Sequence, residues 1–313
     1  MTDNCALALK IDVDTLKGYR EGLPRLLDML KRRGIRASIF FSMGPDNSGK
    51  AVRRIFRRGF LSKMLRTRAP STYGLKTLLY GTLLPAPMIV ESDPGLLRRA
   101  VDEGHDCGVH AWDHVFWQDR LPSLSREAVR EQFARSMELF ERVSGTAPAC
   151  CAAPGWQTTP DALAVQDELG FAYCSDVRGT GPSLPRVFLP RMGGTTFRTP
   201  QIPSTLPTLD ELWGTDGLDA DTVNDRYLDL LEPGVNVHTI HTEMEGGAMS
   251  GVFEALLDAC LEGEMAFMTL REVLAGAAAT ADGGAAPLPV SEVVMREIPG
   301  RAGTVAVQQA AEG

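Results

Sequence analysis

The pattern of apolar and polar positions along the first part of the chain predicts alternating strands and helices. Residues 6–13 form a mostly apolar run, as in a buried strand. Residues 23–33 carry leucines at helical spacing and stop before Gly34, a residue that favours the end of a helix. A second apolar run follows at residues 35–43. A strand, a helix and a further strand in this order predict parallel pairing.

The same alternation continues to about residue 275 and predicts an α/β fold. The further elements that we expect are helices at 95–104, 125–143 and 160–169, strands at 107–110, 150–153 and 171–175, and more such segments between 222 and 274. About seven repeats of this kind favour a distorted (β/α)7-type barrel over an open sheet. In barrels of this class the catalytic side chains lie at the carboxyl ends of the strands.

Two segments fall outside this alternation. Residues 44–94 are too long for a plain connection, so we expect an insertion within a single catalytic domain of residues 1–275. Residues 276–313 contain runs of alanine and glycine and lack periodicity, and we expect a flexible tail there.

Composition and charge exclude several classes of protein. The chain of 313 residues is 44% hydrophobic and 23% charged, which suits a globular enzyme, and its net charge of -8 argues against a nucleic-acid partner. Its six cysteines form no C-x-x-C pair and suit a reducing compartment. We find no basic leader at the start and no apolar run of the ~18 residues that a membrane span requires. These features predict a cytoplasmic protein.

The histidines give the first indication of chemistry. All five lie in two short stretches, at 105, 110 and 114 and at 238 and 241. The i, i+4 spacing of His110 and His114, where a strand is expected to turn into a helix, puts both imidazoles on one face. Two imidazoles and a carboxylate can hold a divalent ion and leave positions for water and substrate. Zinc suits these donors, and cobalt, manganese or nickel could also serve.

Two aspartates at the end of the first predicted strand supply the carboxylates. Asp12 and Asp14 are two residues apart, so on an extended strand they point to the same side. Two carboxylates in one pocket are costly unless a cation neutralises at least one of them. The pattern therefore predicts that one aspartate binds the metal while the other takes a proton. The alternative is that both are turn or capping residues.

These motifs resemble, in order and spacing, those of the NodB-homology polysaccharide deacetylases. The matching residues are Asp12-x-Asp14, His110-x-x-x-His114 and Thr239-Ile240-His241. Longer stretches are similar to one branch of that family, the deformylases of 4-deoxy-4-formamido-L-arabinose-phosphoundecaprenol. These stretches are Lys10–Thr15, Ser38–Asn47, His110–His114, Gln201–Thr208 and His238–His241.

The resemblance implies a role for each matched residue. Asp14, His110 and His114 would bind the metal, Asp12 would act as general base and His241 as general acid. Metal-activated water would attack the formamide of a lipid-linked sugar, releasing formate and a free amino sugar. By the same resemblance the product would serve lipid A modification and resistance to cationic peptides such as polymyxin.

Other residues are expected to support this reaction. Asp176 is a candidate carboxylate that keeps His241 cationic. A backbone N–H near Trp156 would stabilise the tetrahedral oxyanion. Glu243 could contact the sugar or the new ammonium group, and the alternative for it is a solvated loop acid.

The third motif of the family departs from its usual form. It generally contains an arginine and a tyrosine around a proline, whereas Ala152–Trp156 contains neither. The arginine's task of holding the catalytic aspartate therefore has no obvious bearer, and Arg178 is one candidate substitute.

The expected insertion carries a run of basic residues. Between positions 50 and 68 there are eight lysines and arginines and no acid, interleaved with apolar side chains. This pattern is typical of a segment in the membrane interface, where each basic residue adds roughly 1 kcal/mol near an anionic surface. A solvated face and nucleic-acid contact are the alternatives. Peripheral binding to the cytoplasmic face of the bacterial inner membrane would suit a lipid-linked substrate. The expected membrane-binding residues are Arg53, Arg54, Arg57, Arg58 and Lys63.

Two other functions stay open. A deacetylase that acts on chitin or peptidoglycan would share the catalytic residues, but such enzymes generally work outside the cytoplasm. A barrel that binds a metal and a lipid or glycan without turnover is compatible with the altered third motif.

Overall fold

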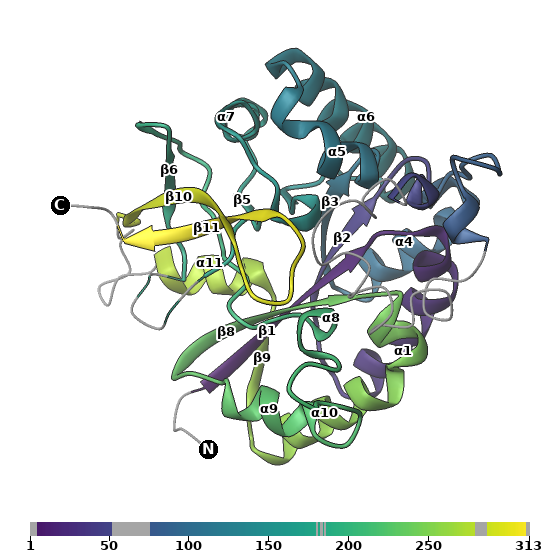
Figure 1. The fold of residues 1–313 in the computed structure, drawn as a ribbon, viewed down its shortest axis with the longest axis vertical. Coiled ribbons are helices and arrows are strands. Elements are labelled where there is room, and N and C mark those ends of the chain that lie inside the picture. Colours follow the sequence, from purple (N-terminus) through teal and green to yellow (C-terminus); the bar gives the residue numbers. More distant parts are fainter. Residues whose placement is uncertain are drawn as a thin grey trace.

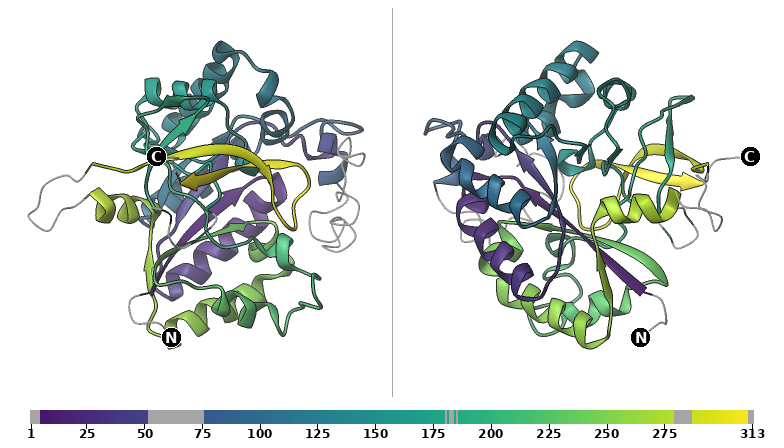
Figure 2. Two further views of the ribbon diagram at one scale, coloured as in Figure 1. Left: turned by 60° about the vertical axis from the view of Figure 1, so that its left-hand side comes forward. Right: turned by 180° about the vertical axis from the view of Figure 1, so that it is seen from behind.

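A sheet of parallel strands forms the centre of the molecule, with helices packed around it (Figures 1 and 2). This computed structural model describes residues 5–51, 76–179, 181, 184, 186–278 and 287–310. The sheet has the strand order β5-β4-β3-β2-β1-β8, and β9 also pairs with β1. The strands are β1 (Cys5–Val13), β2 (Ser38–Ser42), β3 (Asp106–Ala111), β4 (Cys150–Cys151), β5 (Tyr173–Cys174), β8 (Gly234–His241) and β9 (Ala266–Met268).

The gap between the two ends of the sheet is closed by irregular chain. The Ile202 N–H donates to the Cys174 carbonyl on β5 at 2.9 Å, and the Thr205 N–H donates to the Val237 carbonyl on β8 at 3.0 Å. Residues 201–206 therefore stand where a further strand would complete a barrel. The predicted α/β fold of the distorted (β/α)7 type is confirmed.

The helices lie where the apolar periodicity predicts them in most cases. The α-helices are α1 (Leu23–Arg32), α4 (Pro94–Asp102), α5 (His114–Arg120), α6 (Arg126–Ser144), α7 (Pro160–Leu169), α8 (Leu209–Leu212), α9 (Val223–Asp229), α10 (Ser250–Glu262) and α11 (Leu270–Ala278). Short 3-10 or π-helical turns are η1 (Gly18–Gly22), η3 (Thr77–Leu79), η4 (Val90–Ser92), η5 (Leu121–Ser123), η6 (Pro154–Trp156) and η7 (Met244–Ala248). Leu23, Leu26 and Leu27 of α1 are fully buried in the core that covers the sheet, so the leucine spacing reflects real burial.

The end of the chain forms a second, smaller sheet. Its strand order is β11-β10-β6-β7, from β6 (Leu189–Met192), β7 (Thr195–Thr196), β10 (Val290–Glu297) and β11 (Thr304–Ala310). The expected tail without regular structure is therefore wrong for residues 290–310. The reason is tertiary: Val293 and Ala306 are buried only because Val177 and Phe188 of the main domain pack against them. Such a hairpin needs a partner surface, which local periodicity does not reveal.

The predicted insertion is described only at its two ends. Residues 52–75, which include Arg53, Arg54, Arg57, Arg58 and Lys63, lie outside the described residues. At the described ends, Pro45 and Met88 form an antiparallel bridge, so the insertion begins and ends side by side. Within the described residues, every helix is too short or too polar to span a lipid bilayer.

Candidate metal centre and catalytic site

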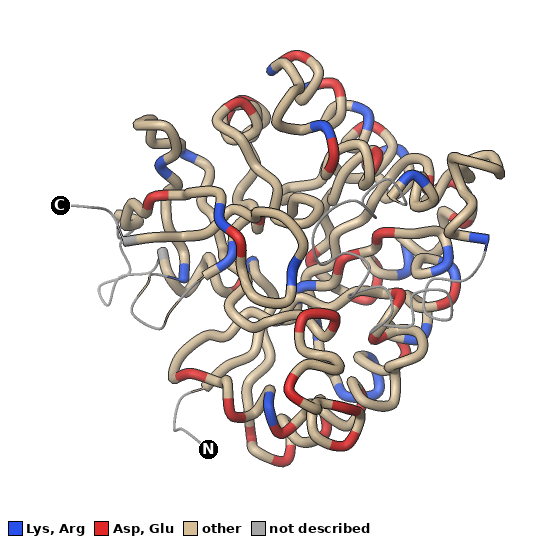
Figure 3. The backbone as a smooth tube through the Cα atoms, in the orientation of Figure 1, with Lys and Arg blue, Asp and Glu red and all other residues tan. Residues whose placement is uncertain are grey.

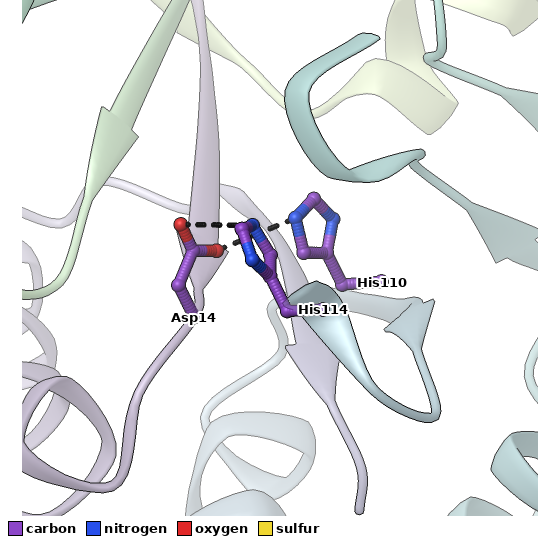
Figure 4. Close-up of side chains that lie close together, drawn as sticks. All are labelled: Asp14, His110 and His114. Atoms are coloured by element: carbon purple, nitrogen blue, oxygen red, sulfur yellow. Dashed lines mark ion pairs between the residues drawn. The ribbon is translucent and has the colours of Figure 1, made fainter. Parts of the chain in front are cut away.

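The three predicted metal ligands meet at the carboxyl ends of β1 and β3, which flank β2 in the sheet (Figure 4). Asp14 follows β1, His110 is the penultimate residue of β3, and His114 is the first residue of α5. His110 Nε2 lies 3.3 Å from Asp14 Oδ1, and His114 Nε2 lies 3.2 Å from Asp14 Oδ2. One ligand atom from each residue lies within 4.8 Å of the others. The spacing of the motifs predicted this convergence.

The charges and bonding of these three residues fit a divalent cation. Burial opposes ionisation of Asp14, but the imidazoles of His114 and His110 outweigh it and hold the pKa of Asp14 well below its usual value. Asp14 Oδ1 is buried, yet it forms no hydrogen bond with a described residue. A carboxylate and two imidazole nitrogens that face one another without hydrogen-bond geometry are the donors that zinc and related ions prefer.

The second histidine is positioned by a helix cap that the sequence analysis did not identify. Asp113 Oδ1 accepts a hydrogen bond from the Phe116 N–H at 2.9 Å, which caps α5 directly before His114. Asn47 Nδ2 donates to the other Asp113 oxygen at 2.6 Å. A short polar residue before the predicted turn into a helix was the available signal. The cap fixes the direction in which His114 leaves the backbone.

Glu243 supports the loop that carries Asp14. Its Oε1 accepts hydrogen bonds from the Thr15 N–H at 2.7 Å, the Thr15 hydroxyl at 2.6 Å and the Asp14 N–H at 3.3 Å. The side chain is 2% exposed, and burial together with the charge of Asp14 raises the pKa of Glu243 to about 8. The solvated-acid alternative does not apply. This geometry favours positioning of a metal ligand over the expected contact with the sugar.

Asp12 lies beside this centre and is paired with a lysine that the sequence analysis assigned no role. Lys10 Nζ lies 2.8 Å from Asp12 Oδ2, and the two side chains are buried on the same strand. Asp12 Oδ1 is buried without a hydrogen-bond partner among the described residues. The candidate substitute, Arg178, instead binds both carboxylate oxygens of Glu211 at 2.8 and 3.0 Å. The i, i+2 spacing of Lys10 and Asp12 was the signal that could have identified the pair.

His241 and Asp176 are held by different neighbours. His241 is the register partner of Asp12 in the pairing of β8 with β1, and its backbone N–H donates to Glu245 Oε2 at 2.9 Å. Asp176 accepts hydrogen bonds from the Ala153 N–H at 2.7 Å and from Gln166 Nε2 at 2.6 Å. Among the described residues, no hydrogen bond or ion pair joins Asp176 to His241. The structure thus brings His241 to Asp12 but does not pair it with Asp176.

Asp176 also lies near two thiols. Cys151, Cys174 and Asp176 place one ligand atom each within 4.8 Å of one another, and all three are buried. Burial raises the pKa of Cys151 well above its usual value and that of Cys174 to about 12. Because a thiolate is the form that binds metal, protonated thiols make this cluster a poor competitor of the histidine site.

Trp156 is enclosed by charged side chains. The ring is 2% exposed, its Nε1 donates to Ser204 Oγ at 3.0 Å, and the Trp156 N–H donates to the Ala153 carbonyl at 3.2 Å. That N–H is therefore engaged within its own turn and does not point to an oxyanion, although the sequence had led us to expect this of an N–H in this region. The Lys10 ammonium lies 5.2 Å from the ring centroid. Trp156 packs against the partner of Asp12.

Comparisons with known proteins show which sequences and folds this chain resembles. The model of the polysaccharide deacetylase family matches residues 7–174, which include Asp12, Asp14 and both metal-site histidines. A protein of Shewanella sediminis (strain HAW-EB3), named probable 4-deoxy-4-formamido-L-arabinose-phosphoundecaprenol deformylase ArnD, is 38% identical over 96% of this chain and 94% of its own. A protein of the same name from Wigglesworthia glossinidia brevipalpis is 29% identical over 93% of this chain and 98% of its own.

A solved structure has the same fold. A protein from Mycobacterium smegmatis that is assigned to the polysaccharide deacetylases aligns with a TM-score of 0.57 and 13% identity, and the alignment covers 88% of this chain and 91% of that one. At this identity the likeness concerns the fold of the barrel alone.

Proposed function

Because the chain belongs to the polysaccharide deacetylase family, whose members hydrolyse amides, we propose that it removes the formyl group from 4-deoxy-4-formamido-L-arabinose-phosphoundecaprenol. The convergence of Asp14, His110 and His114 beside the buried Asp12 is the observation that carries this proposal. We infer the substrate from the two relatives, whose names state this activity. The alignments cover nearly the full length of both relatives. The product amino sugar would serve lipid A modification and resistance to cationic peptides such as polymyxin.

The metal would be held by Asp14, His110 and His114. When bound, a divalent ion lowers the pKa of water and polarises the amide carbonyl. Zinc suits two imidazole nitrogens and one carboxylate, and cobalt, manganese or nickel can be accepted by the same donors.

Asp12 takes the proton from the attacking water. Its Oδ2 is occupied by Lys10 at 2.8 Å, so Oδ1, which has no partner among the described residues, is the oxygen that accepts this proton. His241 lies next to Asp12 in the strand register and gives a proton to the departing nitrogen. The C–N bond of the formamide breaks, formate leaves, and the sugar keeps a free amine. Asp176 acts at a distance, by fixing the turn at Ala153.

Formate release tests this proposal. The metal-loaded protein is incubated with a formamido-sugar on a polyprenyl phosphate and, separately, with the acetamido analogue. We expect formate from the first and little acetate from the second. Release of acetate alone would establish a polysaccharide N-deacetylase in place of the deformylase, and release of neither acid would favour the barrel that binds without turnover.

We also propose that the insertion attaches the protein to the cytoplasmic face of the bacterial inner membrane. Directly after the basic run, Leu79, Leu83 and Leu84 are 36%, 81% and 37% exposed, and residues 76–90 contain no acid. Acidic residues gather instead over α9 and α10 (Figure 3). Exposed leucines beside cationic chain suit an anionic lipid surface, whereas the acidic face does not.

Vesicle sedimentation checks this attachment. We expect the protein to sediment with vesicles that contain an anionic lipid and to stay in solution with neutral ones. Leu83→Ser should weaken sedimentation, while Leu261→Ser, at a leucine of 38% exposure on α10, should not. Equal sedimentation of both variants and the wild type would contradict the proposed contact.

A further inference from the structure

The C-terminal hairpin is formed by β10 and β11 (Figure 1). It packs on Trp156 and is fixed there by several contacts. Val305 and Val307 of β11 are buried against the indole ring. The Arg178 N–H donates to the Ala306 carbonyl at 2.9 Å, and Gln157 Nε2 donates to the Thr304 carbonyl at 2.6 Å. The hairpin is therefore part of the wall of the site.

The turn of this hairpin is seated against α8. Gly300 has a φ of +79°, and a Cβ atom there would lie 2.8 Å from the Glu211 carbonyl oxygen. Only glycine fits both the backbone conformation and the space. The next residue, Arg301, places its guanidinium carbon 4.6 Å from the centroid of the Trp156 ring. The turn thus delivers a cation to the indole.

Arg301 has a surplus of hydrogen-bond donors at this place. Its one described side-chain hydrogen bond is to Glu211 Oε1 at 3.4 Å, and its side chain is only 11% exposed. Glu211 is already satisfied, because Arg178 binds both of its oxygens and the Thr208 N–H donates to Oε2 at 3.1 Å. The guanidinium of Arg301 therefore keeps N–H groups that no described residue accepts, and its planar shape is suited to two oxygens of a phosphate.

The same indole contacts both Arg301 and Lys10, the partner of Asp12. The Lys10 ammonium lies 5.2 Å from the ring centroid and 2.8 Å from Asp12 Oδ2. An anion at Arg301 and an amide at Asp12 would therefore both lie close to Trp156. A pyranose that carries its phosphate at C1 and its formamide at C4 has the two groups on opposite sides of one ring.

We propose that Arg301 binds the phosphodiester of the substrate, and this proposal rests on the proposed function. The site selects sugars that carry a phosphodiester at the carbon opposite the formamide over uncharged glycosides. Arg178 keeps Glu211 in place, and the Trp156 ring packs against the guanidinium of Arg301. Arg301 is a binding residue that takes no part in the transfer of protons.

Steady-state kinetics with two soluble substrates test this assignment. One is the formamido-arabinose joined through a phosphodiester to a short prenyl chain, and the other is the uncharged alkyl glycoside of the same sugar. Arg301→Gln should raise KM for the phosphodiester roughly 10- to 100-fold with kcat nearly kept, since a bond to a charged group is lost. The uncharged glycoside should be hydrolysed equally well by wild type and variant. Because both substrates are soluble, binding of the protein to a membrane does not affect the measured KM values.

Arg296→Gln is the matched control. Arg296 is exposed on the same hairpin, so its removal changes the net charge equally but should leave both KM values unchanged. Melting temperatures of both variants report whether the hairpin stays folded. If Arg301→Gln raises KM by the same factor for both substrates, or changes KM for neither, the assignment of the phosphodiester to Arg301 is overturned. The proposed deformylase activity is unaffected by that result. If the wild type releases formate from neither substrate, the proposed function itself fails, and the assignment fails with it.

Discussion

Lys10 and Asp12 form a buried ion pair within one strand, with Nζ and Oδ2 2.8 Å apart. The two residues are i and i+2 on β1, so their side chains leave the strand on the same side. The pair fixes one oxygen of the carboxylate and leaves the other without a described partner. Among the described residues, the cation paired with Asp12 is therefore this lysine, whereas Arg178 pairs with Glu211.

Replacing Lys10 should impair catalysis through its effect on Asp12, although we propose no contact between Lys10 and the substrate. Lys10→Met leaves a buried carboxylate unpaired, so we expect kcat to fall about 100-fold and the free energy of unfolding to fall by about 3 kcal/mol. Lys10→Arg keeps the charge and should retain kcat within about tenfold. Formate release and denaturant unfolding measure both effects.

A lysine outside the site serves as the control for this prediction. Lys76 is exposed, and Lys76→Met should change neither quantity. Equal kcat for Lys10→Met and the wild type would show that Asp12 is oriented by other means.

Removal of a metal ligand and of the general base should separate binding from hydrolysis. Asp12→Asn is expected to keep one ion per chain while the rate falls about 10²- to 10⁴-fold, because only the proton acceptor is lost. His114→Ala should lose both the ion and the activity. Elemental analysis of the purified variants and formate release give the two readings. Loss of the ion in Asp12→Asn would place Asp12 among the ligands instead.

The cap before His114 should matter to the metal as well as to the helix. Asp113→Ala removes the bond to the Phe116 N–H, so we expect a loss of about 1 kcal/mol in stability and a metal affinity lower by about 10- to 100-fold. Ser125→Ala removes the equivalent cap of α6, whose hydroxyl accepts from the Ala128 N–H, away from the metal site. It should cost similar stability and leave affinity unchanged. Equal affinities in the two variants would contradict the positioning role of Asp113.

The stability of the metal-free chain should fall as the pH rises through the neutral range. Burial raises the pKa of Glu245 from 4.5 to about 8. Between these values the unfolded chain has lost a proton that the folded chain keeps, so the unfolded state is favoured as the pH increases. Glu245→Gln keeps an acceptor for the His241 N–H and removes this proton. Its unfolding free energy should depend less on pH, by about 1.4 kcal/mol per pH unit, in denaturant titrations between pH 5 and 8. Parallel pH profiles for both proteins would disprove this account.

Short-range patterns were sufficient to predict the barrel and the candidate metal centre. The leucine spacing of α1 and the apolar runs of β1 and β2 depend on neighbours a few residues away, and so they can be read along the chain. The same holds for His110 and His114, which need only one turn of chain between them. Asp14 could be predicted to lie near both histidines, because the carboxyl ends of parallel strands lie at one edge of a sheet.

The tertiary structure decided which charges are partners and what covers the site. Lys10 could be paired with Asp12 only once both were known to be buried, and Arg178 was directed to Glu211 by the packing of α8. Asp176 accepts hydrogen bonds from the Ala153 N–H and Gln166 and has no described bond to His241. The hairpin of Arg301 gains its order from contacts with residues far earlier in the chain, at separations from 90 positions for Glu211 to 147 for Gln157. Contacts of such sequence separation leave no periodic trace in the chain, because their free energy exists only when the distant surfaces have already met.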